Sequence, residues 1–128
     1  MKTLLTISTL VFTVVFSSTS FGEWAKVDKN MNGNTWYVDF ETIRKHDGYV
    51  YWWELGDYLK PNKYGIFSAK VYNQGDCKLF RVKRLSFSFH KEPMGRGTGD
   101  VQESVKKGWI YPSPNSSSET ILKTVCSR

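Results

Sequence analysis

The two cysteines, Cys77 and Cys126, carry the most distinctive chemistry in this 128-residue chain. A thiolate can act as a nucleophile or hold a metal ion, but it then needs a neighbouring base or further ligands at a suitable spacing. The sequence places neither beside these two residues. In an oxidising compartment two thiols pair instead. We therefore expect a disulfide between Cys77 and Cys126, provided that the protein is exported.

Other residues capable of acid–base or nucleophilic chemistry are sparse. The histidines are His46, in a turn beside Asp47, and His90, at a strand end. In such places we expect solvated surface groups rather than catalytic bases. Ser104 and Lys107 match the S-x-x-K pattern of penicillin-recognising enzymes, but the companion motifs are missing from the chain. The sequence therefore predicts a protein that is not an enzyme, with no cofactor and no metal site.

The amino-terminal segment has the composition of a secretory signal peptide. Lys2 precedes an uncharged apolar run over residues 4–16, and small polar residues follow it. That run is shorter than the about 20 residues that a membrane-spanning helix needs. We predict a signal peptide over residues 1–20, cleaved after Ser20 or alternatively after Gly22. The rest, residues 21–128, should form a single domain without a transmembrane segment.

Export places the working protein in the periplasm, on the outer surface or in the medium. This location argues against nucleic acid as a partner. The chain carries a formal net charge of +6, which suits an acidic protein, an acidic polysaccharide or an anionic lipid surface. If the charge is spread evenly over the surface, it serves solubility alone.

Aromatic and alternating segments predict an antiparallel sheet of about six strands. Turn signals lie at residues 46–48 and 75–76, and residues 56–63 read as a connection. The glycine-rich loop over residues 95–99 fits a turn better than an anion site, because its spacing matches no phosphate-binding motif. The expected strands are residues 35–40, 49–55, 66–73, 77–90 and 98–105, with a few extended residues over 41–44.

The long strand over residues 77–90 contains a break in its alternation. Phe80 and Val82 share one parity, whereas Leu85 and Phe87 share the other. One extra residue at position 83 or 84 would bring these apolar side chains to one face, as a β-bulge does. We predict a bulge or a sharp bend there. The alternative is a strand whose two halves are buried on opposite faces.

A short helix should close the chain. The residues from Ser116 to Glu119 match a capping box, and Ile121, Leu122 and Val125 follow at helical spacing. The expected helix covers residues 117–126, packs its apolar stripe on the sheet, and is tied by the disulfide to the strand beginning at residue 77. The predicted fold class is therefore α+β: a single curved antiparallel sheet with one carboxy-terminal helix, stapled by a disulfide.

Basic and aromatic residues together indicate a binding face. Lys78, Arg81, Lys83 and Arg84 lie on one predicted strand, where alternation should send most of their side chains to solvent. A sheet face that mixes cations with tyrosine and tryptophan is typical of a protein-binding surface. The alternative is that these rings only pack the face opposite the helix. The candidate binding residues are Arg81, Lys83, Arg84, Tyr49, Tyr51 and Trp53, with Tyr37 and Lys78 nearby.

Short motifs occur in a familiar order: WYVDFETI, an aromatic strand ending in WELGDY, GDC before a basic strand, MGRG, a tryptophan before a proline–serine stretch, and a helix closing with VC. This order resembles the surface-adhesin protein E family of bacterial envelope proteins. The resemblance implies the same sheet-and-helix fold, a disulfide corresponding to Cys77–Cys126, and attachment to host extracellular-matrix or plasma proteins. The amino-terminal segment lacks a lipobox cysteine, which favours a soluble periplasmic or released protein.

Three functions follow from these observations. The first is a non-enzymatic, exported, adhesin-like binding protein that docks protein partners on the aromatic and basic face. The second is a periplasmic structural or assembly accessory protein that pairs with a second copy through a sheet edge, as a homodimer. The third is a small-ligand binder, with a site between helix and sheet or at the glycine loop, lined by Trp109 or Trp53.

Overall fold

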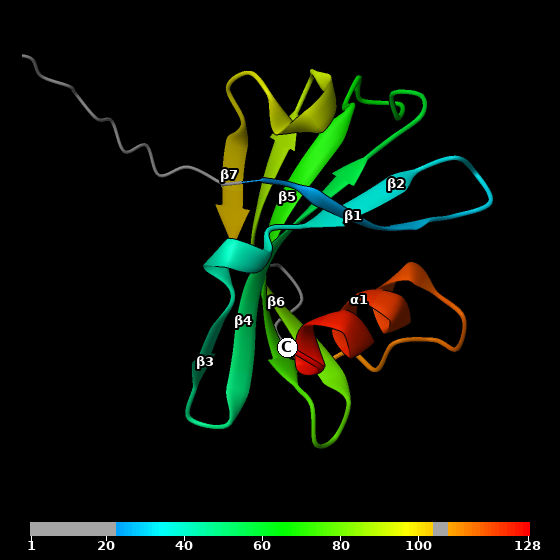
Figure 1. Ribbon diagram of the computed structural model, residues 1–128. Coiled ribbons are helices and arrows are strands. Elements are labelled where there is room, and N and C mark those ends of the chain that lie inside the picture. Colours follow the sequence, from blue (N-terminus) through cyan, green and yellow to red (C-terminus); the bar gives the residue numbers. More distant parts are fainter. Residues whose placement is uncertain (1–22, 104–107) are drawn as a thin grey trace, which may run out of the picture.

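The computed structural model describes residues 23–103 and 108–128 as a curved antiparallel sheet with an α-helix on one face (Figure 1). The predicted signal peptide, residues 1–20, lies outside the described residues. Within the described ranges, no helix has both the length and the apolar composition that crossing a bilayer requires. The predicted fold class is confirmed in its sheet, its helix and its disulfide.

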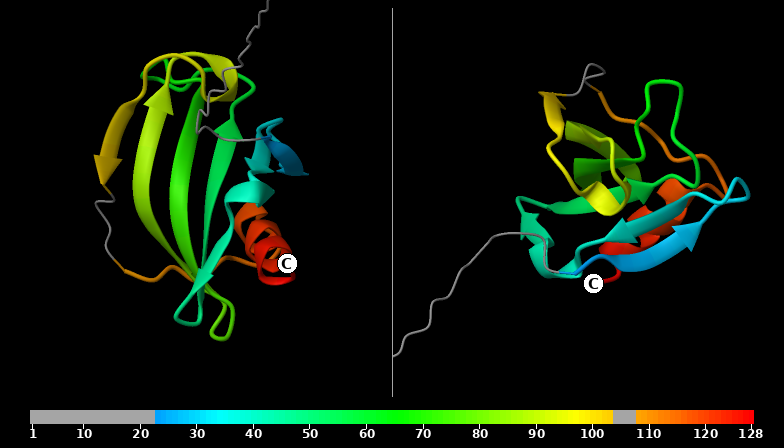
Figure 2. Two further views of the ribbon diagram at one scale, coloured as in Figure 1. Left: turned by 60° about the vertical axis from the view of Figure 1, so that its left-hand side comes forward. Right: turned by 90° about the horizontal axis from the view of Figure 1, so that it is seen from above.

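The strands follow the order β1-β2-β4-β5-β6-β7 across the sheet, and neighbouring strands are antiparallel. The short β3 pairs with the first part of β4 and β2 with its last part, so both lie along the same edge of β4. The sheet curves strongly and remains open (Figure 2). The strands are β1 (Ala25–Lys29), β2 (Thr35–Val38), β3 (Arg44–His46), β4 (Tyr49–Asp57), β5 (Ser68–Asp76), β6 (Arg81–His90) and β7 (Asp100–Glu103).

Several boundaries differ from the sequence prediction. The strand β1 was not expected, and residues 40–42 form the 3-10 helix η1 (Phe40–Thr42), which Asp39 caps through a bond from the amide of Glu41. Strand β5 continues through the predicted turn at residues 75–76. The turn comes later, at residues 77–80, because Asp76 Oδ1 accepts the amides of Lys78 and Leu79, each at 3.1 Å. Cys77 therefore lies in this turn rather than in a strand.

Strand β6 contains the expected bulge, one residue later than predicted. Tyr72 of β5 pairs with Ser86, but the next residue of β5, Asn73, pairs with Arg84, so that Leu85 is the extra residue. The insertion brings Val82 and Phe87 to the same face, where Val82 pairs with Gly75 and Phe87 pairs with Val71.

The helix α1 (Ser117–Cys126) has the predicted bounds. The hydroxyl of Ser116 accepts the amide of Glu119 at 3.1 Å, as a capping box requires. The second half of the box differs, because the Glu119 carboxylate accepts the amide of Asn115 instead of that of Ser116. The helix buries Ile121, Leu122 and Val125 against the sheet, as predicted. They join a core that also contains Val38, Val50, Trp52 and Val82.

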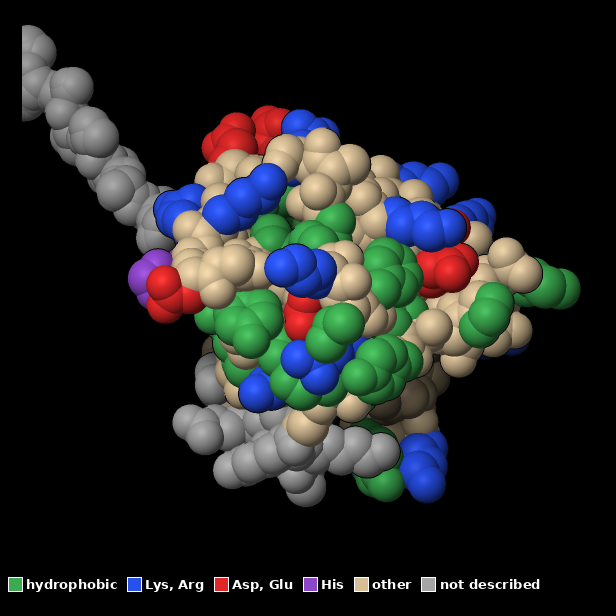
Figure 3. All heavy atoms as spheres, turned by 90° about the horizontal axis from the view of Figure 1, so that it is seen from below, with side chains coloured by type: hydrophobic (Ala, Val, Ile, Leu, Met, Phe, Trp, Pro, Cys, Tyr) green, Lys and Arg blue, Asp and Glu red, His purple; other side chains and the backbone are tan. Residues whose placement is uncertain are grey.

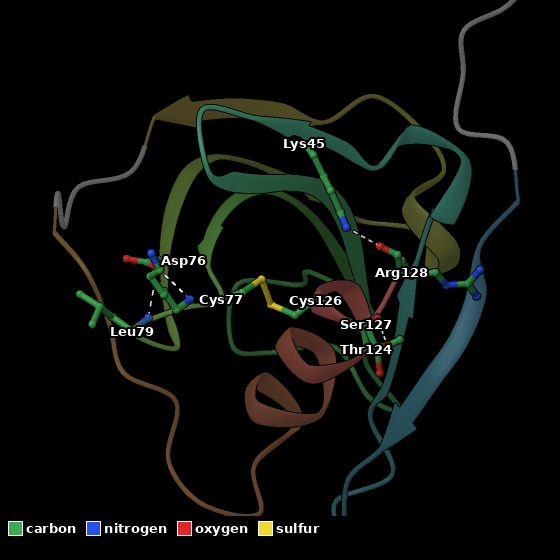
Figure 4. Close-up of a disulfide and its surroundings, with 9 residues drawn as sticks. Lys45, Asp76, Cys77, Leu79, Thr124, Cys126, Ser127 and Arg128 are labelled. Carbon is green, nitrogen blue, oxygen red and sulfur yellow. Dashed lines mark hydrogen bonds between the residues drawn. A yellow bond between two sulfur atoms is a disulfide. The ribbon is translucent and has the colours of Figure 1, made fainter.

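The predicted disulfide joins Cys77 to Cys126 with an S–S distance of 2.04 Å (Figure 4). It connects the β5–β6 turn to the last residue of α1. Beside it, Lys45 of β3 donates a hydrogen bond to the carbonyl oxygen of Arg128. The end of the helix is therefore fixed both to the turn and to the β3–β4 hairpin.

The register defines two faces, because directly opposed residues on neighbouring strands project to the same side. We call the side that carries α1 the helix face; Val50, Trp52, Glu54 and Gly75 lie on it. We call the other side the aromatic face. Its residues on β4, β5 and β6 include Tyr49, Tyr51, Trp53, Lys70, Tyr72, Gln74, Asp76, Arg81 and Lys83, and toward the other end of the strands Leu55, Asp57 and Ser68.

Candidate protein-binding face

Most of the predicted binding residues lie together on the aromatic face. Lys83 is opposite Gln74, Gln74 is opposite Tyr51, and Arg81 is opposite Asp76. All of these side chains therefore share one side of the sheet. The remaining predicted rings, Tyr49 and Trp53, alternate with Tyr51 along β4 on the same side, and Tyr37 of β2 joins them through its pairing with Leu55.

Arg84 does not belong to this face. It pairs with Asn73 of β5, which lies on the helix face beside Glu54. Arg84 therefore points away from Lys83, its neighbour in the chain, toward the amino-terminal turn of α1. The side-chain alternation that assigns Arg81 and Lys83 to one face removes Arg84 from it.

Three rings in mutual contact occupy the middle of the aromatic face. Trp53 and Tyr72 have ring centroids 4.9 Å apart, and Tyr72 and Tyr51 have theirs 6.2 Å apart. The side-chain amide of Gln74 donates to the Tyr51 hydroxyl at 3.1 Å. Tyr72 and Gln74 were absent from the sequence-based set, although the alternation of β5 could have identified them. The contacts hold half-buried rings in fixed orientations, so that a partner would meet an ordered surface.

Trp109 adds a second aromatic group at the end of this face nearest the β5–β6 turn, which we call its lower half. Its ring lies 5.6 Å from that of Tyr49, and both Arg81 (4.3 Å) and Lys83 (4.7 Å) approach its centroid as cation–π contacts. Two backbone hydrogen bonds between Val82 and Ile110, 2.9 and 2.8 Å long, hold the segment against β6. The sequence did not link Trp109 to the basic strand, because the pairing joins segments far apart in the chain.

The two cations of the aromatic face that approach Trp109 differ in electrostatic environment. Arg81 Nε lies 2.9 Å from Asp76 Oδ2. The amide of Leu79 and then the guanidinium of Arg81 hold the pKa of Asp76 below its ordinary value, and the hydrogen bond to Asp76 raises the pKa of Arg81. The charge of Arg81 is thus largely compensated. Lys83 has no carboxylate within ion-pair distance in the described part of the chain, so it is the cation with charge available to a partner.

Exposed apolar groups continue the surface around the β5–β6 turn. Leu79 and Tyr111 are 56% and 62% exposed. Leu79 lies in the turn between Asp76 and Arg81, and Tyr111 follows the residue that pairs with Val82 of β6. Figure 3 shows this end of the molecule, where hydrophobic and basic side chains are interspersed around an acidic one. Exposed apolar, aromatic and basic groups therefore adjoin one another at this end of the molecule.

The other end of the aromatic face, its upper half around Asp57 and Ser68, is covered by the chain itself. The 3-10 helix η2 (Pro93–Gly95) crosses it, with the amide of Met94 bonded to Asp57 Oδ1 at 2.7 Å and that of Gly95 bonded to Ser68 Oγ at 2.8 Å. Leu55 is fully buried beneath this crossing. The predicted turn role of the glycine-rich loop is thus consistent with its packing. In the described structure, Trp109 and the rings of Tyr51, Trp53 and Tyr72 on the lower half of the face are each half-buried.

His90 is buried, which corrects the expectation of a solvated surface group. Its imidazole is 3% exposed, with Nε2 2.6 Å from the Ser88 hydroxyl and Nδ1 3.2 Å from the Gly97 carbonyl oxygen. A serine and a histidine at this distance resemble a nucleophile and its base. However, Gly99 packs directly over both side chains, since an added Cβ there would lie 2.3 Å from Ser88 Oγ. The pair therefore anchors the loop before β7.

His46 is exposed in its turn, as expected, with Nε2 3.2 Å from the carboxylate of Asp47. In the described residues no group of three or more histidine, cysteine or acidic side chains is arranged to hold a metal ion.

A buried carboxyl group lies on the helix face. Glu54 Oε1 accepts the indole N–H of Trp52 at 2.9 Å and the side-chain amide of Asn73 at 3.0 Å. Burial raises the pKa of Glu54, although both donors and the charge of Arg84 act in the opposite direction. A small pocket beside Glu54 separates the sheet from the start of α1. Trp53, one of the tryptophans expected to line a site between helix and sheet, is on the opposite face.

The sheet, the helix and the disulfide agree with the match of the chain to a family model. Residues 24–127 match the model described as surface-adhesin protein E. The protein therefore belongs to the surface-adhesin protein E family and is an adhesin-like protein of the bacterial envelope. No curated protein compared with the chain matches it significantly.

Comparison with solved structures supports the same fold. Crystal form II of Haemophilus influenzae protein E is similar with a TM-score of 0.63 and 18% sequence identity, over 89% of this chain and 97% of that chain. A selenomethionine form of Haemophilus influenzae protein E has a TM-score of 0.62 and 19% identity, over 81% and 85%. At these identities the likeness concerns the fold and does not identify the binding residues of this chain.

Proposed function

We propose that this protein is an exported, non-enzymatic binding protein that docks an acidic segment of a protein partner on the lower half of its aromatic face. The observation that supports this most is the cluster around Trp109, where a half-buried ring is flanked by Tyr49, Arg81 and Lys83. Family membership supports the class of function, because an adhesin acts by binding.

Charge and shape favour an acidic protein segment. Lys83 supplies a positive charge without a neighbouring carboxylate in the described residues, and the side chains of Leu79 and Tyr111 supply exposed apolar area beside it. Aromatic and arginine side chains are the residues on which interface energy concentrates. The rings of Tyr51, Tyr72 and Trp53, which contact one another, lose little conformational entropy on binding, since these contacts already restrict them.

The test is a charge reversal, Lys83→Glu, measured by surface binding to a panel of immobilised extracellular-matrix and plasma proteins. We expect the affinity for any captured partner to fall by at least about tenfold, because an acidic partner would then face a like charge. The matched control is Lys60→Glu, which makes the same charge change at an exposed position in the β4–β5 connection.

Equal affinities for the wild type and Lys83→Glu, with Lys60→Glu also unchanged, would exclude this face. A thermal unfolding curve of each variant checks that the substitutions leave the fold intact. Trp53→Ala provides a second probe that changes the ring surface without changing charge, and a docking role predicts that it also weakens capture.

A further inference from the structure

A second potential site lies on the opposite side of the sheet. A pocket of about 110 Å³ separates the first turn of α1 from the helix face. At about 30 Å³ for each water of the liquid, this space suits a molecule of only a few heavy atoms. Its lining residues come from β2, β4, β6 and α1; they are Trp36, Glu54, Arg84, Ser117, Ser118 and Ile121.

Trp36, which lines this pocket, has a buried hydrogen-bond donor. Its indole Nε1 is shielded from solvent and has no hydrogen-bond partner in the described part of the chain. The six-membered ring lies against Gly56, where an added Cβ would be 2.3 Å from Cζ3. The ring is therefore packed closely against the backbone of β4. Buried donors in native proteins are normally paired, so this one calls for an acceptor.

Arg84 brings a cation whose hydrogen-bonding groups are also unused. Among the described residues, no hydrogen bond or ion pair engages its guanidinium, although the charge of Glu54 acts on it at longer range. One oxygen of the Glu54 carboxylate, Oε1, accepts bonds from both Trp52 and Asn73. The donors left to interact in the pocket are a guanidinium, an indole N–H and the hydroxyl of Ser118, and the carboxylate of Glu54 lies beside them.

We propose that this pocket binds a small oxyanion, a carboxylate, phosphate or sulfate group, through the guanidinium of Arg84 and the indole N–H of Trp36. A guanidinium presents paired N–H groups that match the oxygens of such an anion. The negative charge of Glu54 weakens the binding without blocking the donors. This site uses none of the residues proposed for protein docking, and it places a ligand between helix and sheet, where Trp36 rather than Trp109 or Trp53 lines it.

Nuclear magnetic resonance can detect binding directly at Trp36. Sulfate, phosphate and acetate are titrated separately into ¹⁵N-labelled protein at constant ionic strength, with chloride as the reference anion. We expect a saturable shift of the Trp36 indole resonance, which Trp36→Phe identifies by its loss. Stronger binding of acetate assigns a carboxylate ligand, and stronger binding of sulfate or phosphate assigns a tetrahedral one.

Two substitutions with opposite expected signs test the assignment. Arg84→Gln should weaken binding by about tenfold or more, because it removes charge-assisted hydrogen bonds. Glu54→Gln should tighten binding, because it removes the opposing charge and retains an oxygen for Trp52 and Asn73. Lys83→Glu, on the other face, should leave the anion affinity within about twofold, since surface charges are screened over such distances.

No saturable shift with any of the three anions, or a shift that survives in Arg84→Gln, would overturn the proposal. If Arg84→Gln fails to fold, the near-isosteric Glu54→Gln still decides: unchanged or weaker anion binding in that variant contradicts the site. Since Lys83 and Arg84 lie on opposite faces, failure of protein docking and failure of anion binding are measured independently.

Discussion

Glu54 is the residue whose environment departs most from that of an ordinary surface carboxyl group. It is 8% exposed on the helix face, and one of its oxygens accepts two hydrogen bonds. Desolvation nevertheless dominates and raises its pKa above the ordinary value. The folded protein therefore binds a proton at Glu54 at a higher pH than the unfolded chain does, so that the ionised form opposes folding.

This linkage predicts a stability difference between the wild type and Glu54→Gln. Below the ordinary pKa both states of the wild type are protonated at Glu54 and the carboxyl carries no penalty. As the pH rises through the raised folded pKa, the wild type loses stability, whereas a glutamine does not titrate. We expect Glu54→Gln to be the more stable protein at pH 7 and to lose this advantage toward pH 4, as measured by urea unfolding. Equal stabilities at pH 7 would contradict a penalty from burial.

At the scale of elements, the disulfide and the helix form one unit. The bond joins residues 49 positions apart and ties the last residue of α1 to the β5–β6 turn. The helix contributes Ile121, Leu122 and Val125 to the core, yet with ten residues it is too short to be stable alone. Its position on the sheet thus depends on packing together with the covalent bond.

Replacing both cysteines by serine should therefore lower the free energy of unfolding substantially. For a closed loop of this size, the chain-entropy estimate is about 4 kcal/mol. Urea unfolding of Cys77→Ser/Cys126→Ser beside the oxidised wild type measures the difference, and the wild type with reducing agent is the chemical control. A loss below about 1 kcal/mol would mean that the unfolded chain is already restricted without the bond.

The sequence was most predictive where a local rule acts alone. The bounds of α1 follow from the serine cap and the helical spacing of its apolar residues, and the bulge in β6 follows from the break in alternation. Prediction failed where contacts between segments far apart in the chain determine the position or the burial of a residue. His90 is buried because the loop containing Gly97 and Gly99 returns over it, and Trp109 belongs to the candidate site through a single pairing with β6. Arg84 was wrongly grouped with Lys83, although neighbouring strand residues point to opposite sides.

At the scale of the whole molecule, the sheet separates two surfaces with different chemistry. The helix face encloses the core and a small polar pocket, whereas the lower aromatic face presents rings, Lys83 and the exposed Leu79 and Tyr111. The net charge of +6 adds a general attraction for acidic partners. Docking at the aromatic face should therefore combine a specific ring contact with an electrostatic contribution that depends on salt.

This combination predicts how partner binding responds to ionic strength. The screening length falls from about 10 Å at 0.1 M salt to about 3 Å at 1 M, so the affinity of the wild type for a captured matrix or plasma protein should decrease across that range. The part of the affinity due to Tyr51, Tyr72 and Trp53 should persist. Binding measured by interferometry at several salt concentrations tests this, and affinity that does not change with salt would contradict an acidic partner segment.

The covalent bond between Cys77 and Cys126 also determines how the protein bears mechanical load. The shortest covalent path through the described chain runs along β1 to β5, crosses the two sulfur atoms and continues from residue 126. Tension applied at residues 23 and 128 therefore bypasses β6, β7 and α1. Even when pulling tears β1 and β2 from the sheet, the segment that carries Lys83, Trp109 and Tyr111 remains outside the loaded path. A protein held between two surfaces under shear would keep this part of its chain from being stretched.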